Sequence, residues 1–154
     1  MDSIKEKKRK YRESNSEYFE AILQLRGFSD KDIYDIVDYI EANECRISKE
    51  VIEKDGVDFY LFSQKFIQKL ARWIKERYNC IINITSTLHT RDTKANKDLF
   101  RLTVYARFLP FKIGDIIDYK GERVKITSSG EKVSGKNEKT GKRIFIDLNQ
   151  INFN

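Results

Sequence analysis

The fold is decided by residues 99–109, which read Leu-Phe-Arg-Leu-Thr-Val-Tyr-Ala-Arg-Phe-Leu. Apolar residues alternate there with arginine, threonine and tyrosine, and a period of two is that of a β-strand with one buried face. The apolar face carries Phe100, Leu102, Val104, Ala106 and Phe108. The other face carries Arg101, Thr103, Tyr105 and Arg107. We therefore expect a strand that packs on a core through one face and presents cations and an aromatic ring on the other.

Other stretches show similar β patterns. Residues 17–26, EYFEAILQLR, place their alternate apolar residues on one face and end at Gly27. That face carries Phe19, Ala21, Leu23 and Leu25. Residues 57–62 and 80–89 are further expected strands, and residues 47–54 form a strand or loop that leads to the hairpin signal Asp55-Gly56.

Two segments have helical spacing. Ser29 is suited to cap a helix over residues 29–44, in which Ile33, Ile36, Val37 and Ile40 form the apolar stripe. Ser63 is suited to cap a second helix over residues 64–78. The stripe of that helix contains Phe66, Ile67, Leu70, Trp73, Ile74 and Tyr78. Trp73 shares this stripe, so we expect it to anchor the core rather than to stack on a nucleic-acid base.

The resulting order is β-α-β-β-α-β-β, which is typical of an α+β two-layer domain with both helices on one face of a mainly antiparallel sheet. The opposite face would present polar and aromatic side chains suited to RNA, because phosphates bind arginine and unstacked bases pack on aromatic rings. These are Gln24, Arg26, Tyr60, Arg101, Tyr105 and Arg107. A polar loop over residues 90–98 would add Arg91, Lys94 and Lys97.

The pattern changes after Pro110. Short apolar runs follow, separated by turn residues at intervals of roughly ten residues, a spacing that favours an all-β module. We expect a basic flexible tail over residues 1–16, an α/β RNA-binding-like domain over 17–109, and a small SH3-like β-barrel over 110–154.

Charge is unevenly distributed along the chain, whose net charge is +6. Residues 17–59 hold five Lys/Arg against twelve Asp/Glu, whereas residues 60–109 hold ten against three. This division favours a polyanionic partner on one side of the molecule. No run of about 18 apolar residues is present to span a membrane, and residues 1–10 lack the apolar part of a secretion signal. With only Cys45 and Cys80, neither in a CxxC pair, we expect a reducing, cytoplasmic location.

The sequence carries none of the tested motifs for catalysis. His89 stands alone near a strand end, no GxSxG surrounds Ser63, and neither GxGxxG nor GxxxxGK[ST] occurs. We therefore expect no enzyme activity, no catalytic residue, no small-molecule substrate, and no metal or other cofactor in this chain.

Several stretches carry a family resemblance. Residues 18–26, YFEAILQLR, and residues 56–60, GVDFY, followed by Ser63, resemble the Nmd-three family, the nuclear-export adapters of the large ribosomal subunit and their archaeal relatives. Residues 91–96, the Phe108-Leu109-Pro110 boundary and the opening of the last segment at residues 114–117 are also similar. The resemblance spans roughly residues 17–150.

This resemblance implies a factor that binds the large ribosomal subunit near the tRNA exit and peptidyl sites during late maturation. It also implies a ribosomal-protein-like α/β domain followed by a domain similar to translation factor five-A. Family members carry N-terminal CxxC zinc motifs and, in eukaryotes, a C-terminal export signal, which this sequence lacks. We expect an archaeal-type core or a fragment, without zinc. The resemblance carries over to Glu20, Gln24, Arg26, Asp58, Tyr60, Asp92 and Asn96. Of these, Asp58, Asp92 and Asn96 either brace loops or contact RNA.

The leading hypothesis is thus a non-enzymatic ribosome-binding factor that contacts rRNA of the large subunit, in late maturation or related translation quality control. The predicted RNA-binding residues are Gln24, Arg26, Tyr60, Arg91, Lys94, Asn96, Lys97, Arg101, Tyr105 and Arg107. The alternative is a scaffold that binds ribosomal or translation proteins through the β-barrel and the acidic helix.

Overall fold

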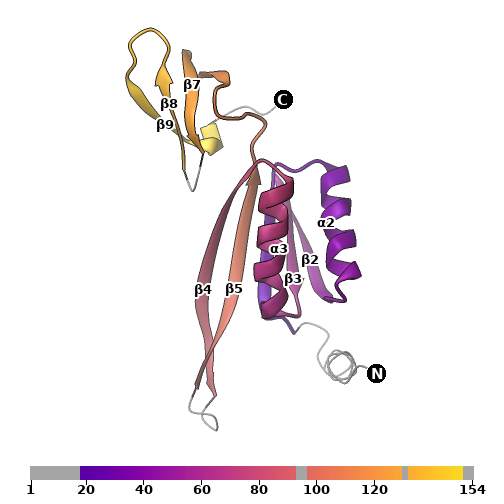
Figure 1. The fold of residues 1–154 in the computed structure, drawn as a ribbon. Helices are drawn as coiled ribbons and strands as arrows, with labels where there is room; N and C mark the ends of the chain where they lie inside the picture. Colours follow the sequence, from indigo (N-terminus) through magenta and orange to yellow (C-terminus); the bar gives the residue numbers. More distant parts are fainter. Residues whose placement is uncertain (1–17, 93–96, 130–131, 151–154) are drawn as a thin grey trace.

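The computed structural model describes residues 18–92, 97–129 and 132–150 (Figure 1). The first part contains β1 (Ala21–Arg26), α2 (Asp30–Ala42), β2 (Ile47–Glu53), β3 (Gly56–Leu61), α3 (Gln64–Arg77), β4 (Cys80–Asp92) and β5 (Lys97–Phe108). The second contains β6 (Ile116–Tyr119), β7 (Glu122–Ser129), β8 (Val133–Asn137), β9 (Arg143–Ile146) and a 3₁₀ turn (Leu148–Gln150). The predicted order β-α-β-β-α-β-β is confirmed for the first part.

The first sheet has the strand order β2-β3-β1-β5-β4. Its central strand β1 pairs antiparallel with β3 and parallel with β5, and the outer pairs β2–β3 and β4–β5 are antiparallel. Both helices lie on one face of this sheet, which confirms the predicted α+β two-layer arrangement (Figure 1). No helix of the described residues lies on the other face (Figure 1).

The main core fills the space between the helices and the sheet. Leu23 and Phe59 of the sheet and Ile36, Ile67 and Leu70 of the helices are almost completely buried. Each such side chain contributes about 1.5–3 kcal/mol by leaving water. This layer therefore fixes which face of β1, β3 and β5 is turned away from the core.

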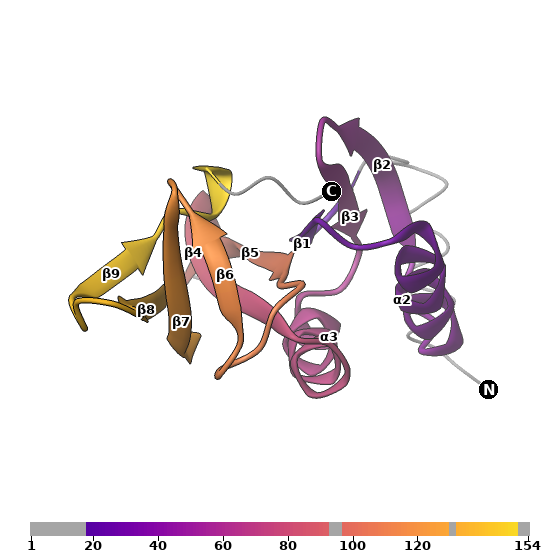
Figure 2. The same ribbon diagram turned by 90° about the horizontal axis from the view of Figure 1, so that it is seen from above.

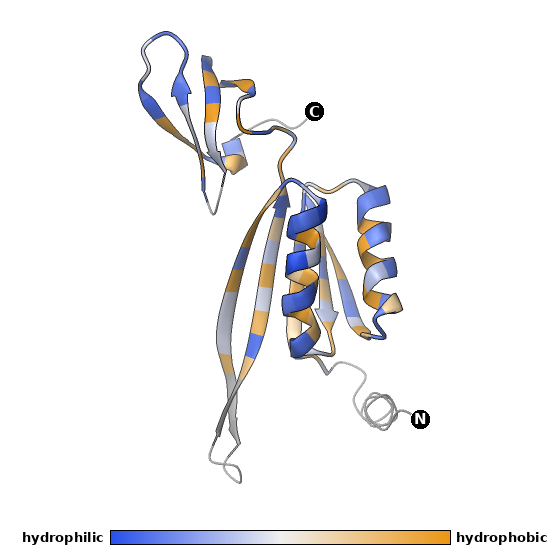
Figure 3. Ribbon diagram, in the orientation of Figure 1, coloured by the Kyte–Doolittle hydropathy of each residue, from blue (hydrophilic) through white to orange (hydrophobic). Residues whose placement is uncertain are grey.

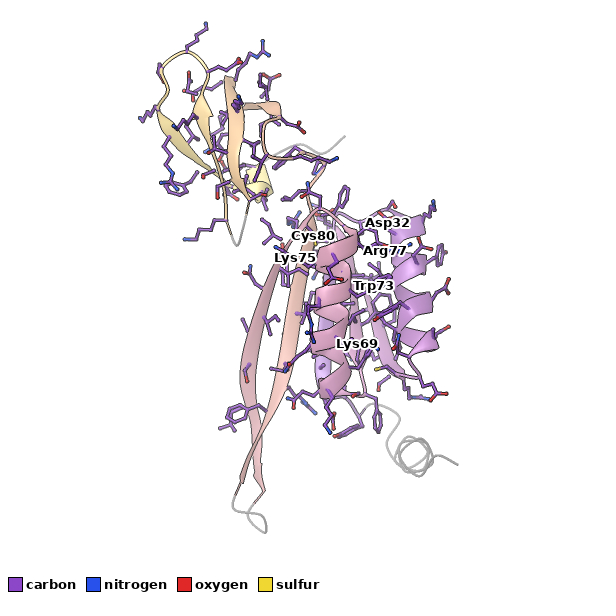
Figure 4. The ribbon with its side chains drawn as sticks, in the orientation of Figure 1. Asp32, Lys69, Trp73, Lys75, Arg77 and Cys80 are labelled. Carbon is purple, nitrogen blue, oxygen red and sulfur yellow. The ribbon has the colours of Figure 1, made fainter. Side chains whose placement is uncertain are left out.

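Aromatic side chains join the two helices. The ring of Tyr39 on α2 stacks on Trp73 of α3 with centroids 4.1 Å apart, and Trp73 packs at the edge of the main core. The position of Trp73 on the helix is visible in Figure 4. The predicted role of Trp73 as a core anchor is confirmed.

The helices begin where capping was predicted. The Ser29 hydroxyl accepts a hydrogen bond from the Asp32 N–H at 3.2 Å, and the Ser63 hydroxyl accepts one from the Phe66 N–H at 3.3 Å. In addition, Glu20 Oε1 accepts a hydrogen bond from the Gln64 N–H at 2.8 Å. The first turn of α3 is thus held by the residue that precedes β1.

Two predicted boundaries are wrong. The first strand begins at Ala21, after a bend at Glu20, and this bend breaks the alternation that placed Phe19 on the core face. The predicted loop over residues 90–98 is also wrong, because β4 extends to Asp92 and β5 starts at Lys97. A register shift between Leu88 and Thr90 accompanies this extension. Residues 90–98 have no apolar alternation in the sequence, so hydrophobic periodicity does not detect the extension of these strands.

A second, four-stranded antiparallel sheet has the order β6-β7-β8-β9. Its core contains Leu109, Phe111, Tyr119, Val124, Ile126, Val133 and Ile146, together with Ile81 from β4. The small sheet therefore packs on one end of the first sheet through Ile81 (Figure 2). Among the described strand pairings none joins β6 to β9, so this sheet is open there, and the SH3-like barrel stays a prediction.

Candidate nucleic-acid interface

The strand register places six of the predicted residues on the sheet face without helices, hereafter the open face. Gln24 of β1 lies between Asp58 of β3 and Tyr105 of β5, and Arg26 lies beside Arg107. Tyr60 pairs with Ile22, two residues from Gln24 on the same face. The open-face residues among those predicted are Gln24, Arg26, Tyr60, Arg101, Tyr105 and Arg107.

Arg107 is held inside this face rather than extended into solvent. Its side chain is 9% exposed, NH1 donates to Asp55 Oδ2 at 3.0 Å, and Nε donates to the Tyr105 hydroxyl at 2.8 Å. Burial lowers the pKa of the guanidinium, but the interactions with Tyr105 and Asp55 outweigh burial and raise the pKa above its ordinary value. Arg107 therefore stays charged and fixes the position of the Tyr105 ring.

Arg26 is also paired. Its NH1 lies 2.8 Å from Asp58 Oδ1 and donates to the Leu25 carbonyl at 2.9 Å. The side chains of Arg26 and Asp58 are 16% and 9% exposed. The distance is short, but Asp58 Oδ1 makes no aligned hydrogen bond with any described residue, so the attraction is mainly one of charge. The pair links β1 to β3, and the choice between loop bracing and RNA contact for Asp58 stays a prediction.

A second cluster lies toward the other end of β1. The guanidinium of Arg101 lies 3.8 Å from the centroid of the Phe19 ring, and Nε donates to the Phe19 carbonyl at 3.2 Å. Phe19 meets Tyr60 edge to face with centroids 4.7 Å apart, and Lys49 Nζ lies 5.3 Å from the Tyr60 centroid. Lys49 on β2 and Arg101 on β5 thus flank two adjacent aromatic rings, those of Tyr60 and Phe19.

Sequence reasoning missed Phe19 and Lys49 in this cluster. Phe19 was expected in the core, and the bend at Glu20 moves it to the open face. Lys49 could be found only from its register with Tyr60, because the sequence left residues 47–54 open between strand and loop.

A groove of about 380 Å³ opens where the two sheets meet. The first sheet contributes Ile81, Asn83, Tyr105 and Arg107. The second sheet and the residues next to its strands contribute Lys132, Val133, Phe145, Ile146, Asp147 and Leu148. Phe145 is 62% exposed, and the Arg143 guanidinium lies 4.9 Å from its ring centroid. The groove therefore places two aromatic rings, from Tyr105 and Phe145, beside cationic groups. The small size of the second part favours packing on the first, but no sequence pattern indicated which residues line the contact.

The remaining predicted residues belong to the β4–β5 hairpin. Arg91 lies on β4 opposite Asp98, and Lys97 lies on β5 opposite Asp92. Lys94 and Asn96 lie outside the described residues, as does the predicted tail over residues 1–16.

The cysteines pack in the main core as predicted. Both Cys45 and Cys80 are buried. Figure 4 places Cys80 at the start of β4, near the end of α3. Burial raises the pKa of the Cys80 thiol to about 11, opposed weakly by Lys75. The thiol is therefore protonated at neutral pH.

No group of three or more His, Cys, Asp or Glu side chains in the described part of the chain is arranged to hold a metal ion. Within the same residues, no helix has the length and apolar content needed to cross a membrane.

Fold and site together define a two-layer α+β protein whose uncovered sheet face clusters arginine and tyrosine side chains and continues into a groove against a second sheet. Residues 18–108 match the family model for NMD3, second domain. This match covers more than half of the chain, so the chain belongs to the NMD3 family, and the resemblance to the Nmd-three family is confirmed. The family is one of ribosome-associated adapter proteins. No curated protein matches the chain.

Proposed function

We propose that this chain is a non-enzymatic ribosome-binding factor that contacts rRNA of the large ribosomal subunit. It would act in the cytoplasm, in late subunit maturation or related translation quality control. Membership in a family of ribosome-associated adapters supports the ribosome as the partner. The small sheet would serve as a second module of SH3-like type beside the ribosomal-protein-like domain.

The observation that carries the proposal is the combination of fixed cations and aromatic rings on the open face. Arg101 and Lys49 each lie against a ring, and Arg107 holds Tyr105 at the groove. Single-stranded RNA is bound by such surfaces, because phosphates neutralise cations and splayed bases stack on aromatic rings. An apolar protein partner would leave these charges desolvated and unpaired.

The geometry favours different roles for the predicted residues. Tyr60 and Tyr105 would stack on bases, and Arg101 would contact phosphate. Arg26 and Arg107 already bind Asp58 and Asp55, so they would position the face rather than bind phosphate with their whole guanidinium. Gln24 would read base edges between them. The hairpin residues Arg91, Lys94, Asn96 and Lys97 would extend the contact along the β4–β5 arm.

The test measures co-sedimentation of the purified chain with large ribosomal subunits over a series of KCl concentrations. The variant, hereafter the open-face variant, carries Lys49→Gln, Arg101→Gln and Tyr105→Leu, which keep both partners of the Arg26–Asp58 and Arg107–Asp55 ion pairs in place. We expect wild-type binding to fall steeply with salt, and the variant to bind at least about tenfold more weakly, which corresponds to 1.4 kcal/mol. The control is Lys31→Gln with Lys65→Gln, two exposed helix cations that equal the variant in charge change. Salt-insensitive binding, or equal loss in variant and control, would contradict the proposal.

The scaffold alternative is favoured by one observation. The outer side of α2 exposes the carboxylates of Asp30, Asp38 and Glu41. In Asp38→Lys with Glu41→Lys, a scaffold that docks proteins through α2 would lose ribosome association, whereas an rRNA-binding factor would keep it. Loss of binding in this variant, with the open-face variant unaffected, would replace the rRNA proposal by the scaffold.

A further inference from the structure

The small sheet carries a row of three cations across neighbouring strands. Lys125 of β7 pairs in register with Lys136 of β8, and Lys136 pairs with Arg143 of β9. All three residues are exposed. Directly opposed residues on paired strands lie on the same face of a sheet, so the three charges stand side by side.

This row works against the stability of the sheet. Adjacent strands lie about 4.8 Å apart, and like charges placed directly opposite each other are destabilising. The neighbouring Arg123 is 3.5 Å from Glu138, but none of the three cations of the row has an ion pair with another described residue. Their repulsion is therefore not offset within the described part of the chain, and a bound anion would relieve it.

The row leads to the groove between the two sheets. Arg143 at its end lies 4.9 Å from the centroid of Phe145, and Phe145 lines the groove together with Tyr105. Figure 2 shows β7, β8 and β9 side by side, next to the end of β4. A linear polyanion lying along the row would thus extend to the aromatic rings of Phe145 and Tyr105.

We infer that Lys125, Lys136 and Arg143 bind the phosphodiester backbone of single-stranded RNA whose bases enter the groove at Phe145 and Tyr105. The inference rests on the proposed function, since it extends the rRNA contact from the open face onto the small sheet. Point charges in a line fit successive phosphates, and a ring beside a cation is the stacking arrangement of single-strand binders. An acidic peptide would satisfy the cations but would not require the rings.

The test uses the whole chain and a fluorescein-labelled oligouridylate, with anisotropy measured over a series of KCl concentrations. The row variant carries Lys125→Gln, Lys136→Gln and Arg143→Gln. The matched control carries Lys31→Gln, Lys65→Gln and Lys112→Gln, three exposed residues that remove the same charge elsewhere. Thermal unfolding of each protein is followed by circular dichroism.

We expect affinity and stability to move in opposite directions. The row variant should lose about 0.7 from the log–log salt slope for each cation removed, while its melting temperature stays equal or rises. The control should keep the slope. Equal slopes in row variant and wild type, or a row variant that melts earlier, would overturn the inference. Equal displacement of the probe by polyglutamate and by unlabelled RNA would also overturn it, because it would indicate an unselective anion site.

Failure of this inference is distinguishable from failure of the proposed function. If the open-face variant loses oligouridylate affinity and the row variant does not, the open face alone binds RNA. If neither variant loses oligouridylate affinity, both the proposed function and this inference are wrong.

Discussion

Glu20 accepts a hydrogen bond over 2.8 Å from the backbone N–H of Gln64, a residue 44 positions further along the chain. The second oxygen of this carboxylate accepts a hydrogen bond from the Tyr18 hydroxyl at 2.6 Å. The carboxylate also faces the positive end of α3, where negative charge is favoured. The entry to the central strand and the start of the basic helix are therefore held together by one side chain.

Removing this carboxylate should weaken the fold. We expect Glu20→Ala to lower the free energy of unfolding by about 1 kcal/mol, the usual cost of a lost helix cap. Glu20→Gln should cost less, because the amide oxygen can still accept from Gln64. Urea unfolding followed by circular dichroism measures both. Glu50→Ala, at an exposed position on β2, is the control, and an equal loss there would contradict the assignment.

The Arg26–Asp58 pair gives a second prediction. Asp58→Ala should cost about 3 kcal/mol of unfolding free energy, because it leaves a guanidinium with little solvent access and no counter-charge. The double variant Arg26→Leu with Asp58→Leu should be more stable than Asp58→Ala, since no uncompensated charge remains. A double-mutant cycle from urea unfolding, built from Arg26→Leu, Asp58→Leu and their combination, checks this, and strictly additive losses would argue against the pairing.

The buried thiol of Cys80 predicts that the free energy of unfolding depends on pH. Burial raises the pKa of Cys80 from 9.0 to about 11 in the folded state. The folded chain then keeps its proton where the unfolded chain has lost it, so this group leaves stability unchanged below about pH 9 and reduces it between pH 9 and 11. The loss reaches about 1.4 kcal/mol per pH unit. Wild type should therefore lose stability faster than Cys80→Ala over this range, and parallel curves would refute the shift.

The turn between β6 and β7 gives a stabilising prediction. Lys120 and Gly121 have φ angles of 50° and 81°, the left-handed pair of a type I′ hairpin turn. Lysine is strained at this φ, whereas asparagine tolerates it. Lys120→Asn should raise the unfolding free energy by about 0.5–1 kcal/mol. Lys120→Val is the reciprocal control and should lower it, and no difference between the two would contradict the turn assignment.

Sequence periodicity was sufficient to predict those helices and strands that bury one face. The apolar stripe of α3 and the alternation of β5 predicted both elements and the correct open face, because burial enforces those periods (Figure 3). The same rule failed for Phe19, since a single bend at Glu20 reverses the direction of a side chain. It also failed for residues 90–98, whose sequence has no apolar alternation although β4 reaches Asp92 and β5 begins at Lys97.

A single sequence does not show which residues far apart in the chain pair with each other. Arg107 was predicted as an RNA contact because it is a cation on the open face, yet its partner Asp55 lies 52 positions away. The groove at Phe145 and the row from Lys125 to Arg143 likewise depend on which strands meet. Charge and residue type indicated the kind of surface, and register decided which side chains are available on it.

The parallel pairing of β1 with β5 sets the order in which the chain can fold during synthesis. Ala21 pairs with Leu102, so the central strand has one edge unsatisfied until most of the first part has emerged. Contacts between such distant residues slow folding and leave strand edges exposed in the meantime. Nascent chains shorter than about 110 residues, by this argument, would be the form most exposed to aggregation and to chaperone capture.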